Sequence, residues 1–245
     1  MGSNAYISAS GAAAQMRDLD VVSNNLANSG TPGFKRSQSV FRAVLEASLR
    51  EANGSMQAGA AASAFVSTDL VGADFSRGSA ERTGSPLHAM IEGPGFFEVQ
   101  TDRGIRYTRA GNFVVNREGQ LATPNGDPIQ GQAGEITIPS GDAQILPTGE
   151  IADRNGNVFG RLKIVDFENL QALVREGDSV FIAGDEAGLS DVPSPKLISG
   201  SIEGSNVNSA RELATMVMLQ RAFETNLRSM QIDDESTERL IEGIR

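Results

Sequence analysis

Acidic side chains are the most abundant groups in this sequence that could take part in chemistry. A pair of carboxylates can hydrolyse a glycosidic bond, and Asp69 and Asp74 form one candidate pair. The chain holds 31 Asp and Glu residues, so such pairs arise by chance, and both candidates lie in sequence with no other feature. We therefore expect no catalytic residues and no enzymatic activity.

Other reactive side chains are few. Cysteine is absent, which excludes a disulfide, a thiolate nucleophile and a cysteine zinc site. His88 is the one histidine, and without a second ligand it is expected on the surface or in a turn. Gly93-Pro94-Gly95 precedes an expected strand and not a helix, so it indicates a turn and not a phosphate loop. We expect no cofactor and no metal.

The charge of the chain excludes several kinds of partner. The formal net charge is -10 and the longest basic cluster is Lys35-Arg36, so binding to nucleic acid or to an anionic membrane surface is not expected. Both ends are near neutral, which permits close packing of many copies. No stretch reaches the roughly 18 apolar residues of a membrane span, and Met1–Ala14 does not resemble a signal peptide.

Near the start of the chain, apolar and small residues recur at alternating spacings of four and three. This heptad pattern predicts a helix from about Asn4 to Asn28. Because the seam is mostly alanine and contains Gly11, the helix is marginal alone in water and needs a partner. It is expected to end near Asn28-Ser29-Gly30, with Gly30 as a left-handed cap.

A second heptad pattern predicts a long amphipathic helix near the other end. Residues 206–242 contain neither Gly nor Pro, and several good N-cap residues precede Ser209, where the helix is expected to begin. Asp233-Asp234-Glu235 interrupts the apolar pattern and indicates a kink, a second helix start or a solvated turn.

Between these helices the sequence changes to short runs of β-forming residues separated by turn signals. The expected strands are Phe96–Gln100, Ile105–Arg109, Asn112–Val115, Glu135–Ile138 and Val158–Phe167. Hairpin turns are expected at Asp102-Arg103-Gly104, Asn125-Gly126 and Asn155-Gly156. A short helix, Val40–Glu51, and a loop rich in Ala, Ser and Gly, Asn53–Ser63, are expected before this region.

The predicted fold class is α+β, with N- and C-terminal helices forming a coiled-coil-like α-domain and a central, mainly antiparallel β-domain. The expected parts are an N-terminal helix and exit turn (1–36), a connecting segment that is partly loop (37–85), the β-domain (86–202) and the C-terminal helix (203–245). The heptads could pack only within the monomer. Even a paired helical hairpin would expose an apolar flank, which favours self-association.

The segment Met16–Arg36 reads M-R-D-L-D-V-V-S-N-N-L-A-N-S-G-T-P-G-F-K-R. It resembles the N-terminal signature of bacterial flagellar rod and hook proteins, a helix ending in N-N-L-A-N followed by a T-x-G-F-K/R turn. At such a sharp helix exit, asparagines and Gly33 can satisfy backbone groups while Phe34 anchors the departing chain.

Two further segments resemble the same family in the same order. Gly93–Gly131 contains G-P-G-F-F-E-V-Q and Y-T-R-A-G-N-F, and the third match joins E-G-S-N-V-N at Glu203 to L-Q-R-A-F-E at Leu219. Within the family, the chain length and the G-E-I-T-I-P segment at Gly134–Pro139 are most similar to the proximal rod subunit. A distal rod or hook-type subunit is the alternative.

The resemblance implies a structural subunit that assembles through its terminal helices into a torque-transmitting tube. It also implies export by the flagellar export apparatus without signal cleavage, location in the periplasmic basal body, and contacts with copies of itself and other rod proteins. A carbohydrate-binding or hydrolytic cell-wall protein is the alternative class, but 11 Phe and 2 Tyr are too few for an exposed aromatic cluster. The expected assembly interface comprises Ala5, Ala9, Ala12, Met16, Leu19, Asn24, Asn25, Leu26, Asn28, Gly33, Phe34, Leu213, Met216, Phe223, Leu227 and Met230.

Overall fold

The structure is a computed structural model that describes residues 3–43, 66–139, 142–177 and 179–242. The chain divides into two units. The helical unit comprises residues 1–26, 37–72 and 209–245, and the β unit comprises residues 27–36 and 73–208. The backbone therefore passes from one unit to the other four times.

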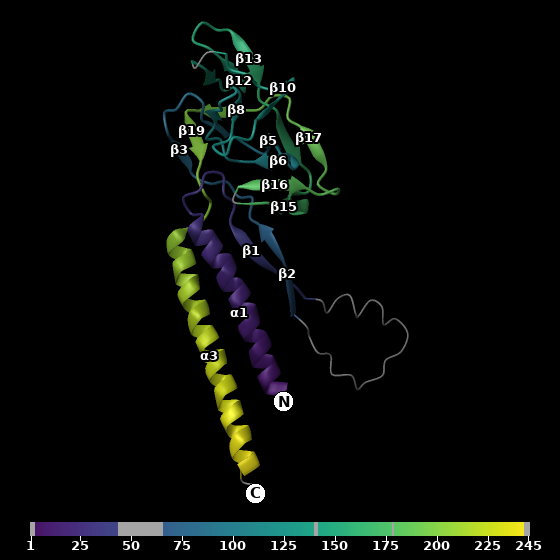
Figure 1. The fold of residues 1–245 in the computed structure, drawn as a ribbon, viewed down its shortest axis with the longest axis vertical. Helices are drawn as coiled ribbons and strands as arrows, with labels where there is room; N and C mark the ends of the chain where they lie inside the picture. Colours follow the sequence, from purple (N-terminus) through teal and green to yellow (C-terminus); the bar gives the residue numbers. More distant parts are fainter. Residues whose placement is uncertain (1–2, 44–65, 140–141, 178, 243–245) are drawn as a thin grey trace, which may run out of the picture. The chain divides into compact units, whose positions relative to one another are not determined.

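The helical unit contains two long helices, α1 (Ser3–Ala27) and α3 (Ser209–Glu242) (Figure 1). Both confirm the helices that the heptad patterns predict. α3 continues as helix through Asp233–Glu235, which excludes a turn or a second helix start at that point. Together with the antiparallel sheets of the β unit, the helices confirm the α+β class.

The end of α1 differs from the prediction in the residue that takes the left-handed conformation. The expectation for Gly30 is wrong: Gly33 has a φ of 68°, and Gly30 is not among the glycines with positive φ. The Thr31 amide donates to the Asn28 carbonyl at 3.2 Å, and the Phe34 amide donates to the Thr31 carbonyl at 3.2 Å. These two turns carry the chain past Gly30 before it reverses at Gly33.

A strand pair replaces the beginning of the helix predicted at Val40–Glu51. β1 (Ser37–Ala43) pairs with β2 (Val66–Ala73), so the prediction is wrong for Val40–Ala43. Residues 44–51 of that helix, and the loop predicted at 53–63, lie outside the described residues. A partner strand far away in the chain outweighs the local helix pattern here, and a local pattern does not reveal such a partner.

The largest sheet of the β unit is antiparallel, with strand order β15-β16-β6-β5-β14-β17. Its strands are β5 (Phe96–Thr101), β6 (Gly104–Thr108), β14 (Ile164–Phe167), β15 (Leu173–Arg175), β16 (Val180–Ala183) and β17 (Leu189–Asp191), with a 3-10 turn, η1 (Leu170–Ala172), before β15. The smaller sheets contain β11 (Gln144–Ile145), β12 (Glu150–Ala152) and β13 (Val158–Arg161), and the pairs β3 (Ala80–Arg82) with β19 (Ser201–Glu203), β4 (Ala89–Ile91) with β18 (Leu197–Ser199), β7 (Val114–Val115) with β8 (Leu121–Ala122), and β9 (Gln130–Gly131) with β10 (Gly134–Glu135).

The predicted hairpin turns are confirmed. β5 and β6 pair up to Thr101 and Gly104, and Gly104, Gly126 and Gly156 all have positive φ, as tight turns require. The predicted strand at Glu135–Ile138 is shorter than expected, because β10 ends at Glu135.

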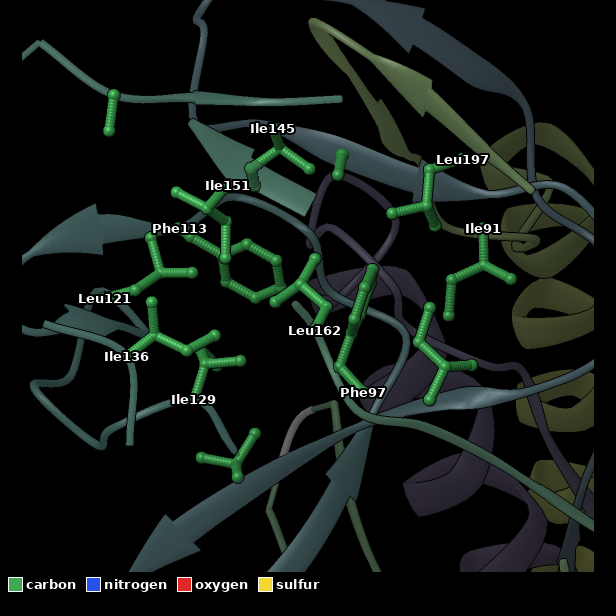
Figure 2. Packing of buried hydrophobic residues seen from close by; sticks show 14 of the residues in the cluster. Ile91, Phe97, Phe113, Leu121, Ile129, Ile136, Ile145, Ile151, Leu162 and Leu197 are labelled. Atoms are coloured by element: carbon green, nitrogen blue, oxygen red, sulfur yellow. The ribbon is translucent and has the colours of Figure 1, made fainter. Parts of the chain in front are cut away.

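Two hydrophobic clusters hold the β unit together. The larger one is built from isoleucine, leucine and phenylalanine side chains, among which Phe97 and Phe113 meet edge to face at 4.9 Å (Figure 2). The second cluster surrounds Phe96, Phe167 and Phe181. Phe75, which lies between β2 and β3, packs on Phe96 and Phe181, so the segment after β2 is anchored in this second core.

Candidate functional site

The turn that follows α1 is inserted into the β unit and is held there by its backbone. The Gly33 amide donates a hydrogen bond of 2.7 Å to the Glu203 carbonyl. A Cβ atom on Gly33 would lie 2.3 Å from the Ala110 amide nitrogen, so only glycine allows this close approach. The N-terminal signature therefore meets β19, at the start of the C-terminal signature, through main-chain atoms.

Phe34 anchors the turn. Its side chain is fully buried, and the Arg175 guanidinium lies over its ring at 4.3 Å. Arg175 also donates a hydrogen bond to the Lys35 carbonyl. Phe34 thus has the anchoring position that the helix-exit pattern predicts.

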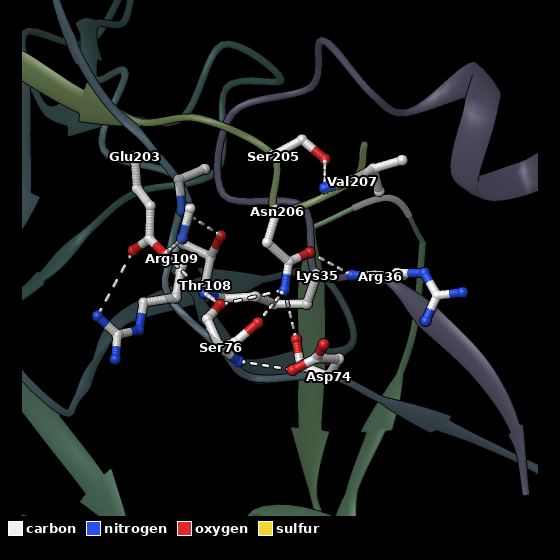
Figure 3. Close-up of polar contacts among 12 residues, drawn as sticks. Lys35, Arg36, Asp74, Ser76, Thr108, Arg109, Glu203, Ser205, Asn206 and Val207 are labelled. Atoms are coloured by element: carbon white, nitrogen blue, oxygen red, sulfur yellow. Dashed lines mark hydrogen bonds and ion pairs between the residues drawn. The ribbon is translucent and has the colours of Figure 1, made fainter. Parts of the chain in front are cut away.

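Lys35 and Glu203 form a buried ion pair (Figure 3). Their charged atoms are 2.6 Å apart, and each side chain is 1% exposed. Lys35 Nζ also donates to the Ser76 carbonyl at 2.8 Å, and Glu203 Oε1 accepts from the Gly78 amide at 3.0 Å. Burial lowers the pKa of Lys35 below 10.5, although the Glu203 carboxylate partly offsets this effect.

Arg109 is a second cation beside Glu203. Its Nη1 lies 3.6 Å from Glu203 Oε2, and its guanidinium lies 5.1 Å from the centre of the Phe96 ring. Burial lowers the pKa of Arg109 below its usual value, against the attraction of the Glu203 carboxylate. One buried carboxylate is therefore shared by two cations.

Asn206 adds hydrogen bonds between the same segments. Its Oδ1 accepts from the Arg36 amide at 2.6 Å, while its Nδ2 donates to the carbonyls of Asp74 and Ser76 at 2.8 and 3.1 Å. We call the group formed by Lys35, Arg109, Glu203 and Asn206 with residues 74–78 the clasp (Figure 3). All its members belong to the β unit.

The helical unit has a polar centre of its own at Asn25. Asn25 Oδ1 accepts from the Ser37 amide at 2.7 Å, and its Nδ2 donates to the Ser37 carbonyl at 2.9 Å and to Glu212 Oε2 at 3.4 Å. Asn25 and Glu212 are fully buried. One side chain thus links the last turn of α1, the first residue of β1 and the first turn of α3.

Polar side chains join the two helices at two places. Asn226 Nδ2 donates to Gln15 Oε1 at 3.0 Å, and a Cβ atom on Gly11 would lie 3.3 Å from the same nitrogen. With the Asn25 contact to Glu212, these pairs show that α1 and α3 run antiparallel. The absence of a side chain at Gly11 allows the two helices to approach closely.

The contact positions lie one residue before the predicted heptad seams. Gln15, Asn25, Glu212 and Asn226 make contact where the seams would have used Met16, Leu26, Leu213 and Leu227. One residue turns an α-helix by 100°, since 3.6 residues complete a turn. At these four positions the predicted seam residue therefore lies to one side of the polar contact.

Exposure reflects this rotation. Met16 is 55% exposed, Leu213 49% and Leu227 40%. Ala12 is buried, and the other predicted seam residues whose burial is described are half-buried: Leu19, Leu26, Met216, Phe223 and Met230. Ala5 and Ala9 lie in α1, and their side chains are outside the description.

The predicted residues at the helix exit have different surroundings. Asn25, Asn28, Gly33 and Phe34 are buried within the subunit, and Asn24 is exposed. Sequence reasoning gave no role to Lys35 and Glu203 and only a helix-capping role to Asn206, although all three lie inside the quoted signature motifs. For Lys35 a signal was available: it directly follows Phe34, at the position where the T-x-G-F-K/R turn has a basic residue.

The described residues contain no group of three or more His, Cys, Asp or Glu side chains that could hold a metal ion. His88 lies in a turn: its amide donates to the Ser85 carbonyl at 3.2 Å, and its Nδ1 lies 2.8 Å from the Thr83 hydroxyl. No helix in the described part of the chain is long and apolar enough to cross a membrane.

Three family models match this chain in order. They are the flagella basal body rod protein model over residues 6–35, the flagellar hook protein FlgE/F/G D1 domain over 90–158, and the flagellar basal body rod FlgEFG protein C-terminal model over 198–242. The first and third contain Lys35 and Glu203, the two halves of the buried ion pair.

Similar proteins cover nearly the whole chain. The flagellar basal-body rod protein FlgG of Buchnera aphidicola subsp. Schizaphis graminum is 33% identical, with 96% of this chain and 97% of the relative covered. FlgF of Caulobacter vibrioides is 30% identical, with 93% and 92% covered, and FlgF of Mesorhizobium japonicum is 27% identical, with 100% and 98% covered.

Two terminal helices and a central β unit, matched along nearly the whole chain by these proteins, define a structural protein of the bacterial flagellum and not an enzyme. The chain belongs to the flagellar basal-body rod protein family. It is a structural subunit of the rod, and it assembles with other rod proteins.

Proposed function

We propose that the subunits assemble into a torque-transmitting tube through the apolar stripes of their terminal helices. The observation that supports this most directly is the exposure of Met16, Leu213 and Leu227 on helices whose mutual contacts include Gln15, Asn25 and Asn226. The exposed parts of these stripes would pack on neighbouring subunits in a coiled-coil-like arrangement.

The energy available from such packing is sufficient. Burying one large apolar side chain contributes about 1.5 to 3 kcal/mol. Each subunit contributes several, including Val217 and Ile232, which are 47% and 57% exposed. Small alanines on α1, including Ala5 and Ala9, would let neighbouring helix axes approach closely.

In this proposal residues 1–36 and 203–245 form the assembly elements around the connecting segment 37–85 and the central domain 86–202. The buried residues Asn25, Asn28, Gly33 and Phe34 support the interface from within the subunit. Leu19, Leu26, Met216, Phe223 and Met230, which are half-buried, would complete it at the edge of each stripe.

We further propose that the chain is a proximal, FlgF-type rod subunit. An alignment that is longer than the number of residues it covers contains insertions relative to this chain. The alignment with FlgF of Mesorhizobium japonicum has 247 positions for all 245 residues. The alignment with FlgF of Caulobacter vibrioides has 230 positions for 93% of the chain, about 228 residues. The FlgG alignment needs 267 positions for 96% of the chain, about 235 residues. Few insertions separate this chain from FlgF, whereas many separate it from FlgG. A distal, FlgG-type role is the alternative, because identity to FlgG is 33%.

Location and partners follow from this assignment as proposals. The subunit would be exported by the flagellar export apparatus without signal cleavage and would assemble in the periplasm. Labelling a tagged chain in isolated basal bodies tests the position: label at the base of the rod supports the proximal assignment, and label next to the hook supports the distal one.

The assembly proposal is tested by Leu227→Asp. This change places a charge in the stripe, so rods should fail to form while the β unit stays folded, as circular dichroism of the purified protein can verify. Leu189→Asp is the matched control, because Leu189 is 48% exposed on β17 of the β unit. Rods that form normally with Leu227→Asp would contradict the proposal.

A further inference from the structure

The clasp gathers every segment of the β unit that adjoins a passage to the helical unit. The passages follow residues 26, 36, 72 and 208. On the β-unit side they adjoin the exit turn 27–36, the segment that begins at residue 73, and the segment that ends at residue 208. Lys35, Ser76 and Glu203 represent these three segments and are joined by bonds of 2.6 and 2.8 Å.

Backbone bonds join the same segments. The Asp74 amide donates to the Arg36 carbonyl at 2.8 Å, and the Asn206 amide donates to the Phe34 carbonyl at 3.4 Å. The Gly204 carbonyl lies 1.9 Å from where a Cβ on Gly78 would be, so residues 78 and 204 are also in close contact. The three segments are fixed to one another and not only to the sheets behind them.

The chemistry of the clasp favours a positioning role over simple stabilisation. A buried ion pair adds little net stability compared with apolar side chains of similar volume, because both charges lose their hydration. It does fix geometry, since an unpaired buried charge is costly and alternative placements of the segments would leave one unpaired. Lys35 and Glu203 are each 1% exposed, so neither can bind a neighbouring subunit directly.

We propose that the clasp is a positioning device for rod assembly, which holds the attachment points of both terminal helices and of the β1–β2 pair at one place in the β unit. This inference rests on the proposed function, in which the helices carry the assembly contacts. Lys35, Glu203 and Asn206 act as positioning residues, and rod formation depends on them although they contact no other subunit.

The test compares Lys35→Met and Glu203→Gln with a matched control, Lys163→Met. Lys163 pairs with the buried Glu98 at 3.0 Å in the same β unit, but this pair touches none of the segments next to a passage. Rod formation in cells should be lost or strongly reduced with Lys35→Met and Glu203→Gln. It should be retained with Lys163→Met.

Hydrogen exchange of the purified full-length chain supplies a local readout. In Glu203→Gln the Gly78 amide, which donates to Glu203 Oε1, should exchange roughly tenfold to a hundredfold faster, the change expected when a hydrogen bond to a charged group is lost. The amides of Gly33 and Arg36, which are bonded to the Glu203 carbonyl and to Asn206 Oδ1 in the same clasp, should also exchange faster. The amides of β5 and β6 should keep their protection. A role confined to overall stability would instead change both sets of amides together.

Asn206→Ala covers the case in which the charge variants do not fold. It removes hydrogen bonds to Arg36, Asp74 and Ser76 without leaving a buried charge unpaired. Faster exchange at Arg36 with loss of rods supports the proposal.

Two outcomes overturn it: normal rods from Asn206→Ala, or an equal loss of rod formation with Lys163→Met. If Leu227→Asp also forms normal rods, the assembly proposal itself fails. If only the clasp variants assemble normally, this inference alone fails.

Discussion

Asn226 donates a hydrogen bond of 3.0 Å to Gln15, and these two residues stand immediately before Leu227 and Met16 in the sequence. The heptad patterns predict Leu227 and Met16 as the seam residues at this level of the helices, and the amide pair makes the contact one residue earlier. Polar contacts within the subunit and an exposed apolar stripe suit a chain that must first exist alone and then pack on its neighbours.

Gly33→Ala should destabilise the β unit by more than 1 kcal/mol. Gly33 has a φ of 68°, and a Cβ atom would collide with the Ala110 nitrogen at 2.3 Å. Gly30→Ala is the matched control, since a Cβ there meets nothing within 4 Å. It should be neutral or stabilise by up to about 1 kcal/mol. Urea unfolding of the two variants measures this, and equal stability would contradict the assignment of the turn.

Asn25→Ala should destabilise the helical unit by about 1 to 3 kcal/mol. The change leaves the buried Ser37 amide and carbonyl without the partners that Asn25 supplies. Asn24→Ala, at the exposed neighbouring position, should have a smaller effect. Thermal unfolding followed by helical circular dichroism compares the two, and a larger loss with Asn24→Ala would contradict this role of Asn25.

His88 should titrate below its usual value of 6.5, because burial lowers its pKa. As pH falls below 6.5, the unfolded chain takes up the proton before the folded chain does. The free energy of unfolding should therefore fall between pH 6.5 and the lower pKa of the folded state. His88→Gln should remove this part of the pH dependence. Since the chain has one histidine, its NMR titration is unambiguous, and a pKa above 6.5 would contradict the prediction.

Sequence reasoning succeeds where local chemistry decides the structure. Heptad spacing predicts both helices, and glycines at positions such as Gly104 and Gly156 predict the hairpins, because positive φ is a property of one residue. It fails at β1, whose partner β2 lies more than twenty residues away. A heptad pattern identifies an apolar stripe but does not reveal whether the partner is the same chain or another copy.

The candidate site shows the same division. Phe34 could be predicted as an anchor from the helix exit alone. The bond between Lys35 and Glu203 joins residues 168 positions apart, so only the folded β unit brings them together. The clasp could have been suspected from one sign, a lysine and a glutamate inside two signature motifs of the same family.

Cysteine cross-linking in assembled rods tests the central claim most directly. The chain has no cysteine, so Met16→Cys, Leu213→Cys and Leu227→Cys each introduce a single reactive thiol, and Ile105→Cys, at a 45% exposed position in the β unit, is the control. In rods, oxidation should link each stripe variant to a neighbouring subunit, and the same variants should stay uncrosslinked as dilute monomers. Rods that assemble normally but yield no cross-links at these three positions would contradict the account.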